Sequence, residues 1–193
     1  MPQSAVPTLR ERQRAAVRDE LAGAALQLVL KQGFDETTID QIVSAVGISR
    51  RSFFHYFATK EDVVLGDLDA LGETLRAALE GRPADEDAWT ALGEALRSLG
   101  GGMSPEVRLS LANLYERTPS LQARHLQKHV RWQALLAPDI ERRLGVLAGD
   151  PRAAALIAAS LGCLDVAVEE WRRSGGTADA EAIYRDCVAA IRA

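Results

Sequence analysis

The sequence predicts an all-α fold of about nine helices, and three observations support this. Apolar residues recur at three- and four-residue intervals along most of the chain, which is the spacing of one helix face. Helix-start signals with proline in the first turn occur at Ser104-Pro105, Thr118-Pro119 and Asp150-Pro151. No segment alternates apolar and polar residues as a half-buried strand does. The expected domains are a three-helix domain, residues 1–62, and a larger helical domain, residues 63–193.

Two short helices joined by a tight turn are predicted in the first domain, after a long first helix that ends near Gln32. Thr38 is a typical N-cap, and Gln41 three residues later completes a capping box. Gly47 can adopt the positive φ that a sharp turn requires. Ser49 caps the second short helix. This order of elements predicts a helix-turn-helix.

The second short helix separates its apolar and polar residues. Phe53 and Phe57, at i and i+4, are expected to point inward. Polar side chains near the start of the helix then face outward, as in a helix that reads the major groove of DNA. Arginine there binds guanine O6 and N7 bidentately, and the sequence leaves open which arginine reads a base. Arg50, Arg51 and His55 are expected at base edges with Ser52 beside them, and Thr37, Thr38, Tyr56 and Lys60 at phosphates.

Residues 10–65 resemble the operator-binding domain of the TetR family of transcriptional regulators, and the rest of the chain matches that family in length and helical layout. The resemblance implies a homodimer on a pseudo-palindromic, double-stranded DNA operator, acting as a repressor that a small molecule releases. The family usually has Tyr at the position of Phe54 and Thr at that of Ser52. The matching residues are Gly33, Phe34, Thr37, Thr38, Ile39, Ile42, Ala45, Val46, Gly47, Ile48, Ser49, Phe53, Tyr56, Phe57, Lys60 and Glu61.

The charge pattern is compatible with DNA binding although the net charge is −4. Residues 1–62 contain eight basic and eight acidic residues, so this part is neutral. Basic residues gather locally at the recognition helix and at the start of the chain, where Arg10, Arg12, Arg14 and Arg18 either reach DNA as an arm or form a solvated helix start.

There is no leader pattern and no apolar run of the ~20 residues that a membrane helix needs. We therefore expect a cytoplasmic protein with no membrane contact.

The second domain is predicted to consist of helices throughout. Val64, Leu68, Leu71, Leu75 and Leu79 keep one helical spacing, which predicts a single helix that starts at Thr59 and connects the two domains. Pro138 is expected to kink or split the helix that contains it. The remaining predicted helices span about 85–99, 105–117, 119–147 and 151–174, followed by a last helix that ends near Arg192.

A small-molecule effector is expected in a cavity between the helices that span residues 59–147. Its binding is expected to shift the connecting helix and so the spacing of two recognition helices. The stretch 117–123, followed by Arg131-Trp132, is similar to a subgroup of the family that senses acyl-coenzyme A-like molecules, which implies an apolar slot with a cationic mouth. The candidate ligand-binding residues are Trp89, Met103, Leu111, Tyr115, Arg131 and Trp132.

The last two helices are interpreted as a dimer interface. The helix from residue 151 is apolar around most of its circumference and must be covered on more than one side. The alternative is that these residues form the core of a monomer. The expected interface residues are Leu161, Leu164, Val168, Trp171, Ile183 and Cys187.

Two other classes of function differ from a ligand-controlled regulator in what they require of the sequence. A DNA-binding protein controlled by its abundance or by a protein partner would need no small-molecule effector. An enzyme is not indicated, because the spacing gives no nucleophile–base pair and no paired carboxylates. No cofactor is expected either.

No metal site is expected from the sequence. His125 and His129 have the i, i+4 spacing that two zinc ligands use on one helix. The accompanying Glu of the zincin motif is absent, and no third ligand is suggested, so a solvated helix face is the favoured interpretation. Cys163 and Cys187 lack metal-type spacing and are interpreted as small buried apolar residues.

Overall fold

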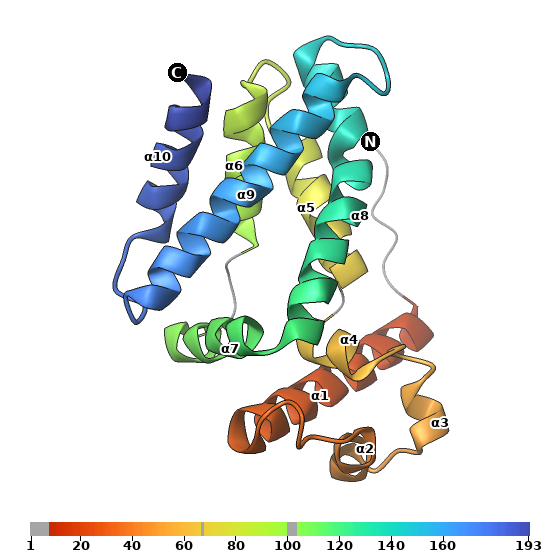
Figure 1. Cartoon of the computed structure of the whole chain (residues 1–193). Coiled ribbons are helices and arrows are strands. Elements are labelled where there is room, and N and C mark those ends of the chain that lie inside the picture. Colours follow the sequence, from red (N-terminus) through yellow and green to blue (C-terminus); the bar gives the residue numbers. More distant parts are fainter. Residues whose placement is uncertain (1–7, 67, 100–103) are drawn as a thin grey trace. The chain divides into compact units, whose positions relative to one another are not determined.

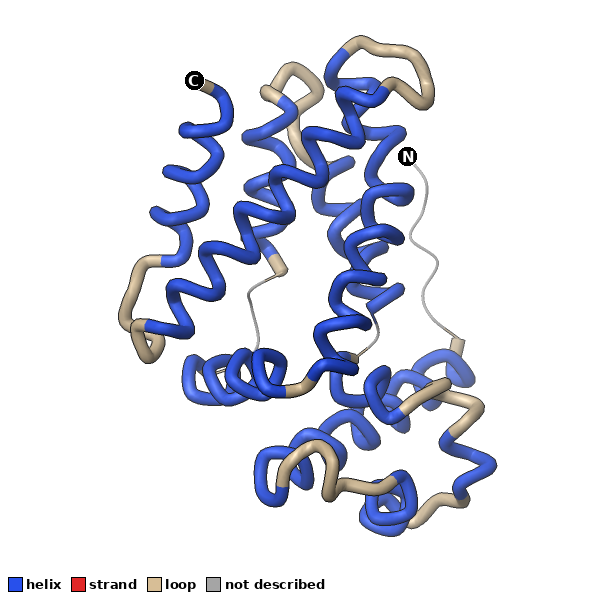
Figure 2. Tube along the Cα trace, in the orientation of Figure 1, coloured by secondary structure: helices blue, strands red, loops and turns tan. Residues whose placement is uncertain are grey.

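The all-α fold class is confirmed by the computed structural model, which describes residues 8–66, 68–99 and 104–193. These ranges contain ten helices and no strand (Figures 1 and 2). The chain divides into two compact units, Met1–Asp67 and Leu68–Ala193. The expected domain boundary after residue 62 falls within a helix. The helices of the first unit are α1 (Leu9–Gln32), α2 (Ile39–Val46), α3 (Arg50–Phe53) and α4 (Lys60–Leu65).

The first unit is held together by one apolar core. Leu21, Ala25 and Val29 of α1 repeat every four residues and are buried, as their helical spacing requires. Ile42 of α2 and Phe53 of α3 are fully buried in the same unit. The long helix α1 packs on α2 and α4, and α3 packs on α2.

Local backbone signals set the bounds of α2, as the sequence predicts. The capping box is present, because the Thr38 side chain accepts from Gln41 N–H and the Gln41 side chain accepts from Thr38 N–H. Gly47 ends the helix with φ 76° and donates its N–H to Val43 O. A residue with a Cβ is strained in this left-handed conformation, so glycine permits the turn at little cost.

The predicted single helix from Thr59 to about residue 80 is wrong. The structure has α4, which ends at Leu65, and a separate α5 (Leu68–Glu80). Gly66 lies between them with φ 76° and ψ −167°, a conformation essentially restricted to glycine that cannot continue a helix. The apolar spacing gave no warning, because periodicity alone does not detect a break between two amphipathic segments.

The second unit packs six helices around its own core (Figure 1). α9 lies between α8 and α10 and packs on both, while α5 packs on α6 and α8. Leu75, Leu92, Leu136, Ile140 and Ile157 are fully buried in this core. The helices are α5, α6 (Ala88–Ser98), α7 (Pro105–Arg117), α8 (Pro119–Leu144), α9 (Pro151–Arg173) and α10 (Ala180–Arg192).

One helix of this unit contains a proline, and another is unusually apolar. α8 continues through Pro138 as one helix, so the proline does not split it. By length and composition alone, α9 is long and apolar enough to cross a membrane. Core helices of soluble proteins pass the same test, and Leu156, Ile157 and Leu161 of α9 belong to the core described above.

Candidate functional site

The helix-turn-helix presents a small polar surface at the start of α3. The N-cap Ser49 accepts from Ser52 N–H at 3.0 Å, and Phe53 and Phe57 are buried, as predicted. Beyond the short helix, Tyr56 N–H donates to Phe53 O at 2.8 Å, so the chain continues as a tight turn. We call the outward side chains of Arg50, Arg51, Ser52, His55 and Tyr56 the recognition surface.

The two arginines of the recognition surface differ in their contacts. Arg50 forms an ion pair with Asp40 of α2, with 3.2 Å between Nη1 and Oδ2. Both side chains are largely exposed, so the pair contributes little to stability. Arg51 is exposed and makes no ion pair with any residue in the described ranges. Its guanidinium is therefore available to a partner from outside the chain.

Two arginines near the start of the chain contact this region. Arg14 of α1 donates to His55 O at 3.4 Å, and the Arg18 guanidinium lies 4.8 Å from the centre of the Phe57 ring. These contacts hold part of the basic segment against the turn that follows α3.

Two of the expected phosphate contacts are used within the fold instead. Thr37 has 0% exposure, and its hydroxyl donates to Gly33 O at 2.8 Å, so its expected role in DNA binding is corrected to a structural one. The Lys60 ammonium donates to Phe34 O at 2.7 Å and Thr37 O at 2.8 Å. Lys60 therefore stabilises the loop between α1 and α2 through these two hydrogen bonds. At most one N–H of its ammonium group is left for a phosphate. Thr38 remains exposed at the start of α2.

A half-open groove of about 540 Å³ lies between α6, α9 and α10. We call it the α6–α10 groove. Its apolar lining includes Trp89, Leu164, Val168, Tyr184 and Val188. Charged side chains also line it, among them Arg97, Arg108, Glu181, Arg185 and Arg192.

The structure does not bring the six predicted ligand-binding residues together at this groove. Trp89 lines it, whereas Met103 lies outside the described residues. Leu111 is buried, and Trp132 is a core residue whose Nε1 donates to Leu68 O at 3.2 Å. Arg131 forms an ion pair with Asp69 at 3.0 Å. Tyr115 is partly buried, and this burial raises the pKa of its hydroxyl.

The predicted dimer residues are only partly exposed. Leu161 has 1% exposure in the core of the unit, so its assignment to an interface is corrected. Leu164 and Val168 line the α6–α10 groove, and Trp171, Ile183 and Cys187 are partly exposed. A different face of α9 is open to solvent and carries small or β-branched apolar residues at helical spacing: Ala155, Ala158, Gly162 and Val166. The sequence indicates this helix as part of the interface, but the interface residues selected from it are the large apolar ones.

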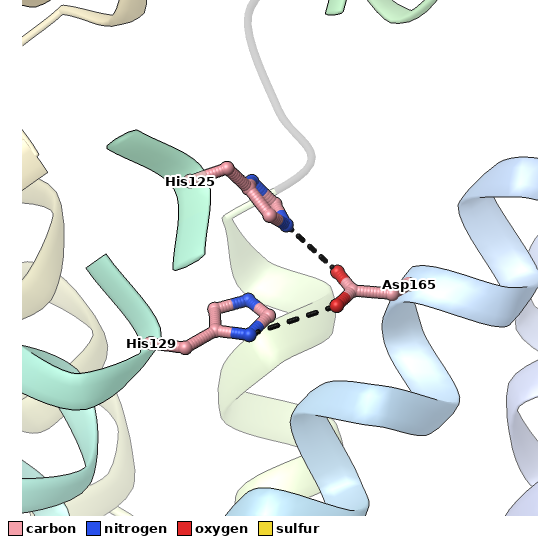
Figure 3. Close-up of side chains that lie close together, drawn as sticks. All are labelled: His125, His129 and Asp165. Carbon is pink, nitrogen blue, oxygen red and sulfur yellow. Dashed lines mark hydrogen bonds and ion pairs between the residues drawn. The ribbon is translucent and has the colours of Figure 1, made fainter. Parts of the chain in front are cut away.

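A cluster of two histidines and a carboxylate lies between α8 and α9 (Figure 3). His125 Nε2 is 2.9 Å from Asp165 Oδ1, and His129 Nδ1 is 3.6 Å from Asp165 Oδ2. Lys128 Nζ is 3.2 Å from His125 Nδ1. The interpretation of these histidines as a solvated helix face is therefore wrong, because they face a carboxylate on another helix.

Burial changes the ionisation of this cluster. It lowers the pKa of His129 to about 4, although the Asp165 carboxylate acts in the opposite direction. It also lowers the pKa of Lys128 to about 8, again against Asp165. His129 is consequently a neutral imidazole near neutral pH. Asp165 lies 40 positions from His125 in the chain, and no local pattern in the sequence connects them.

The fold and the recognition surface define a helix-turn-helix DNA-binding regulator. A capped α2, a tight turn and an α3 whose exposed first turn carries two arginines are the elements that place donors in a major groove. Among the residues the structure describes, α3 is the helix that follows such a turn and offers unburied arginines at its start.

Comparison with known proteins identifies the family. Residues 21–66 match the model of the bacterial regulatory proteins of the tetR family, and residues 86–193 match the MftR C-terminal domain. The chain is 37% identical over 186 residues to the HTH-type transcriptional regulator TcmR of Streptomyces glaucescens, covering 92% of this chain and 82% of that protein. The protein belongs to the TetR family of transcriptional regulators, a family whose members are not enzymes.

Further similarities extend along the whole chain. The chain is 28% identical to a mycofactocin biosynthesis transcriptional regulator, MftR, of Mycobacterium tuberculosis, over 89% of this chain and 88% of that one. A TetR-family structure from Syntrophomonas wolfei aligns with a TM-score of 0.63 at 18% identity, covering 92% of each chain. The repressor FadR of Thermus thermophilus, in complex with lauroyl-CoA, aligns with a TM-score of 0.57 at 24% identity, covering 89% and 91%. These two structures support the fold.

Proposed function

We propose that this TetR-family regulator is a homodimeric cytoplasmic repressor, which binds a pseudo-palindromic operator and is released by a small apolar or acyl-type molecule. The observation that carries the proposal is the recognition surface, where Arg51 is exposed and has no ion-pair partner among the described residues. An arginine in this position on a helix-turn-helix is suited to bidentate recognition of guanine.

We assign base recognition to Arg51 and an auxiliary role to Arg50. Arg50 is held by Asp40, so its guanidinium must exchange a carboxylate for a DNA phosphate or base. Arg51 gives up no ion pair when it binds. His55 and Tyr56 follow on the same turn and extend the surface toward neighbouring bases and phosphates. This division of roles makes Arg51 the residue whose loss changes sequence preference most.

Dimerisation in this proposal uses the exposed small-residue face of α9. Ala155, Ala158, Gly162 and Val166 let a second helix approach closely, and a Cβ built on Gly162 would meet no atom within 4 Å in the single chain. A two-fold dimer would present two α3 helices to successive major grooves about 34 Å apart. A pseudo-palindromic operator follows from that symmetry.

The α6–α10 groove is the proposed effector site. Its volume of about 540 Å³ lies within the roughly 300–1,000 Å³ typical of small-molecule pockets. Apolar side chains line it, and Arg185, which also lines it, has no ion-pair partner in the described part of the chain. An acyl chain with an anionic head group fits this chemistry, and the structurally similar FadR binds lauroyl-CoA.

The test is to select binding sites from random duplex DNA and then add saturated acyl-CoA thioesters of increasing chain length. We expect an enriched pseudo-palindrome bound by two chains, with affinity that falls steeply as salt rises. Acyl-CoA should release the wild type, whereas a Val168→Trp variant with a filled groove should stay bound. No enriched site would contradict the regulator, and an enriched site without release would favour control by abundance or by a protein partner.

A further inference from the structure

Three side chains with metal-ligating atoms converge between α8 and α9. His125 and His129 stand one turn apart on α8, and Asp165 reaches them from α9 (Figure 3). One ligand atom from each residue can be chosen so that all three lie within 4.8 Å of one another. We propose that His125, His129 and Asp165 bind a divalent transition-metal ion.

The spacing of the ligand atoms fits a coordination shell. With metal–ligand distances of about 2.1 Å, neighbouring ligand atoms of a tetrahedral or octahedral shell are about 3.0–3.4 Å apart. The two histidine–carboxylate separations, 2.9 Å and 3.6 Å, are close to this range. These two separations involve different oxygens of Asp165, whereas one ligand atom from each residue gives a set within 4.8 Å. The separations that exceed the range must therefore contract, which needs small side-chain rotations.

The donor set selects the kind of ion. Two imidazoles and one carboxylate suit Zn²⁺, Co²⁺, Ni²⁺ or Fe²⁺, whereas Mg²⁺ and Ca²⁺ prefer shells of oxygen atoms. Three protein ligands leave at least one position for water or for an anionic group of another molecule. The site therefore resembles an open metal site more than a closed structural one.

The helices that carry the ligands are firmly held. α8 and α9 pack against each other, and Trp132 and Leu161, within one turn of the ligands, are core residues. The His129 side chain is only 13% exposed. Little ordering of the backbone is therefore needed when the ion binds, which favours affinity.

Lys128 competes with the ion in this arrangement. Its ammonium lies 3.2 Å from His125 Nδ1 and 4.6 Å from the centre of the Trp132 ring. A metal-bound histidine donates its second ring N–H to an acceptor, and an ammonium group cannot accept it. Lys128 must therefore turn away when His125 binds a metal, so its removal should tighten binding.

The proposal is tested on the full chain after EDTA treatment and dialysis, with ZnCl₂ titrated by calorimetry and CoCl₂ followed by visible absorption. We expect one ion per chain. His129→Gln and His125→Gln should each weaken binding by more than the roughly 10–100-fold typical of losing an outer-shell partner. Lys128→Met should bind more tightly than the wild type.

Matched controls identify the ligands. The chain has one histidine besides His125 and His129, namely His55, which lies in the first unit. His55→Gln should therefore leave metal affinity unchanged. The Co²⁺ spectrum should lack thiolate charge-transfer bands, which excludes Cys163 and Cys187 as ligands. Asp165→Asn keeps the shape of the side chain but removes its charge, and it should also weaken metal binding. Circular dichroism verifies that each variant is folded.

Two results would overturn the proposal. One is the absence of heat and of a Co²⁺ spectrum at millimolar metal. The other is binding that His125→Gln, His129→Gln and Asp165→Asn all leave unchanged, which would place the ion elsewhere.

Discussion

The recognition surface in the first unit and the histidine–carboxylate cluster in the second hold their polar side chains in opposite ways. Arg51 is exposed and has no ion-pair partner among the described residues, while Arg50 is held only by an exposed ion pair. His129 and Asp165, in contrast, face each other between two packed helices. The first arrangement needs a partner from outside the chain, whereas the second is largely satisfied inside it.

Within the first unit, the side chains that bind DNA in the proposed complex differ from those that stabilise the fold. Exposed charged groups at the start of α3 contribute little to the folded state, so they are free to serve binding. The apolar residues beneath them, Phe53 and Phe57, determine whether the surface exists at all, because they anchor the turn that presents it. Substitutions on the two sides of α3 should therefore affect different measurements.

The largest expected effect comes from the buried side of α3. Phe53→Ala should lower the free energy of unfolding by about 3–5 kcal/mol, because a fully buried aromatic ring is lost and a cavity remains. Urea unfolding followed by far-UV circular dichroism measures this loss. All three tryptophans, Trp89, Trp132 and Trp171, lie in the second unit, so their fluorescence shows whether the loss is confined to the first.

The neighbouring phenylalanine is the matched control. Phe54 is 49% exposed, and Phe54→Ala should change the free energy of unfolding by no more than about 0.5 kcal/mol. Equal losses for the two variants would show that Phe53 does not anchor the recognition surface.

A smaller effect is expected at the capping box. Thr38→Ala should cost about 1 kcal/mol of folding free energy, because Gln41 N–H loses its acceptor at the start of α2. Thr38→Ser keeps the hydroxyl and should be close to the wild type in urea unfolding. If the serine variant were as unstable as the alanine variant, the cap hydrogen bond would not be the cause.

The smallest effect on stability is expected from the exposed ion pair. Asp40→Asn should change the free energy of unfolding by less than about 1 kcal/mol, since exposed pairs contribute little. It should nevertheless strengthen binding to DNA of any sequence, because a negative charge is removed beside Arg50. Titration of labelled duplexes at low salt would reveal this gain, and weaker binding would show that Asp40 orients Arg50 for DNA.

Short-range features of the first unit follow from its sequence. The capping box of Thr38 and Gln41, the turn at Gly47 and the inward Phe53 and Phe57 depend on residues only a few positions apart. The break at Gly66 is an exception. An isolated glycine within an apolar pattern does not reveal its backbone conformation, so the sequence did not predict this break.

Long-range features could not be predicted from the same patterns. The contacts of the Lys60 ammonium with Phe34 O and Thr37 O join segments that meet only in the folded unit. Asp165 is the missing third member of the histidine cluster and comes from a different helix. The sequence shows many small residues in α9, but not which of them are exposed, because alanine and glycine are as compatible with a helix core as with an interface.

In the proposed complex, Arg51 reads a base in the operator. The direct measurement is the affinity of wild type, Arg51→Ala and Arg50→Ala for the selected operator and for duplexes varied at each position, at fixed salt. Arg173, an exposed arginine of the second unit, provides the control variant Arg173→Ala. We predict that Arg51→Ala loses about 1–3 kcal/mol of binding free energy and its preference at one base pair, with urea unfolding unchanged. Unchanged affinity and unchanged sequence preference in Arg51→Ala would contradict the account.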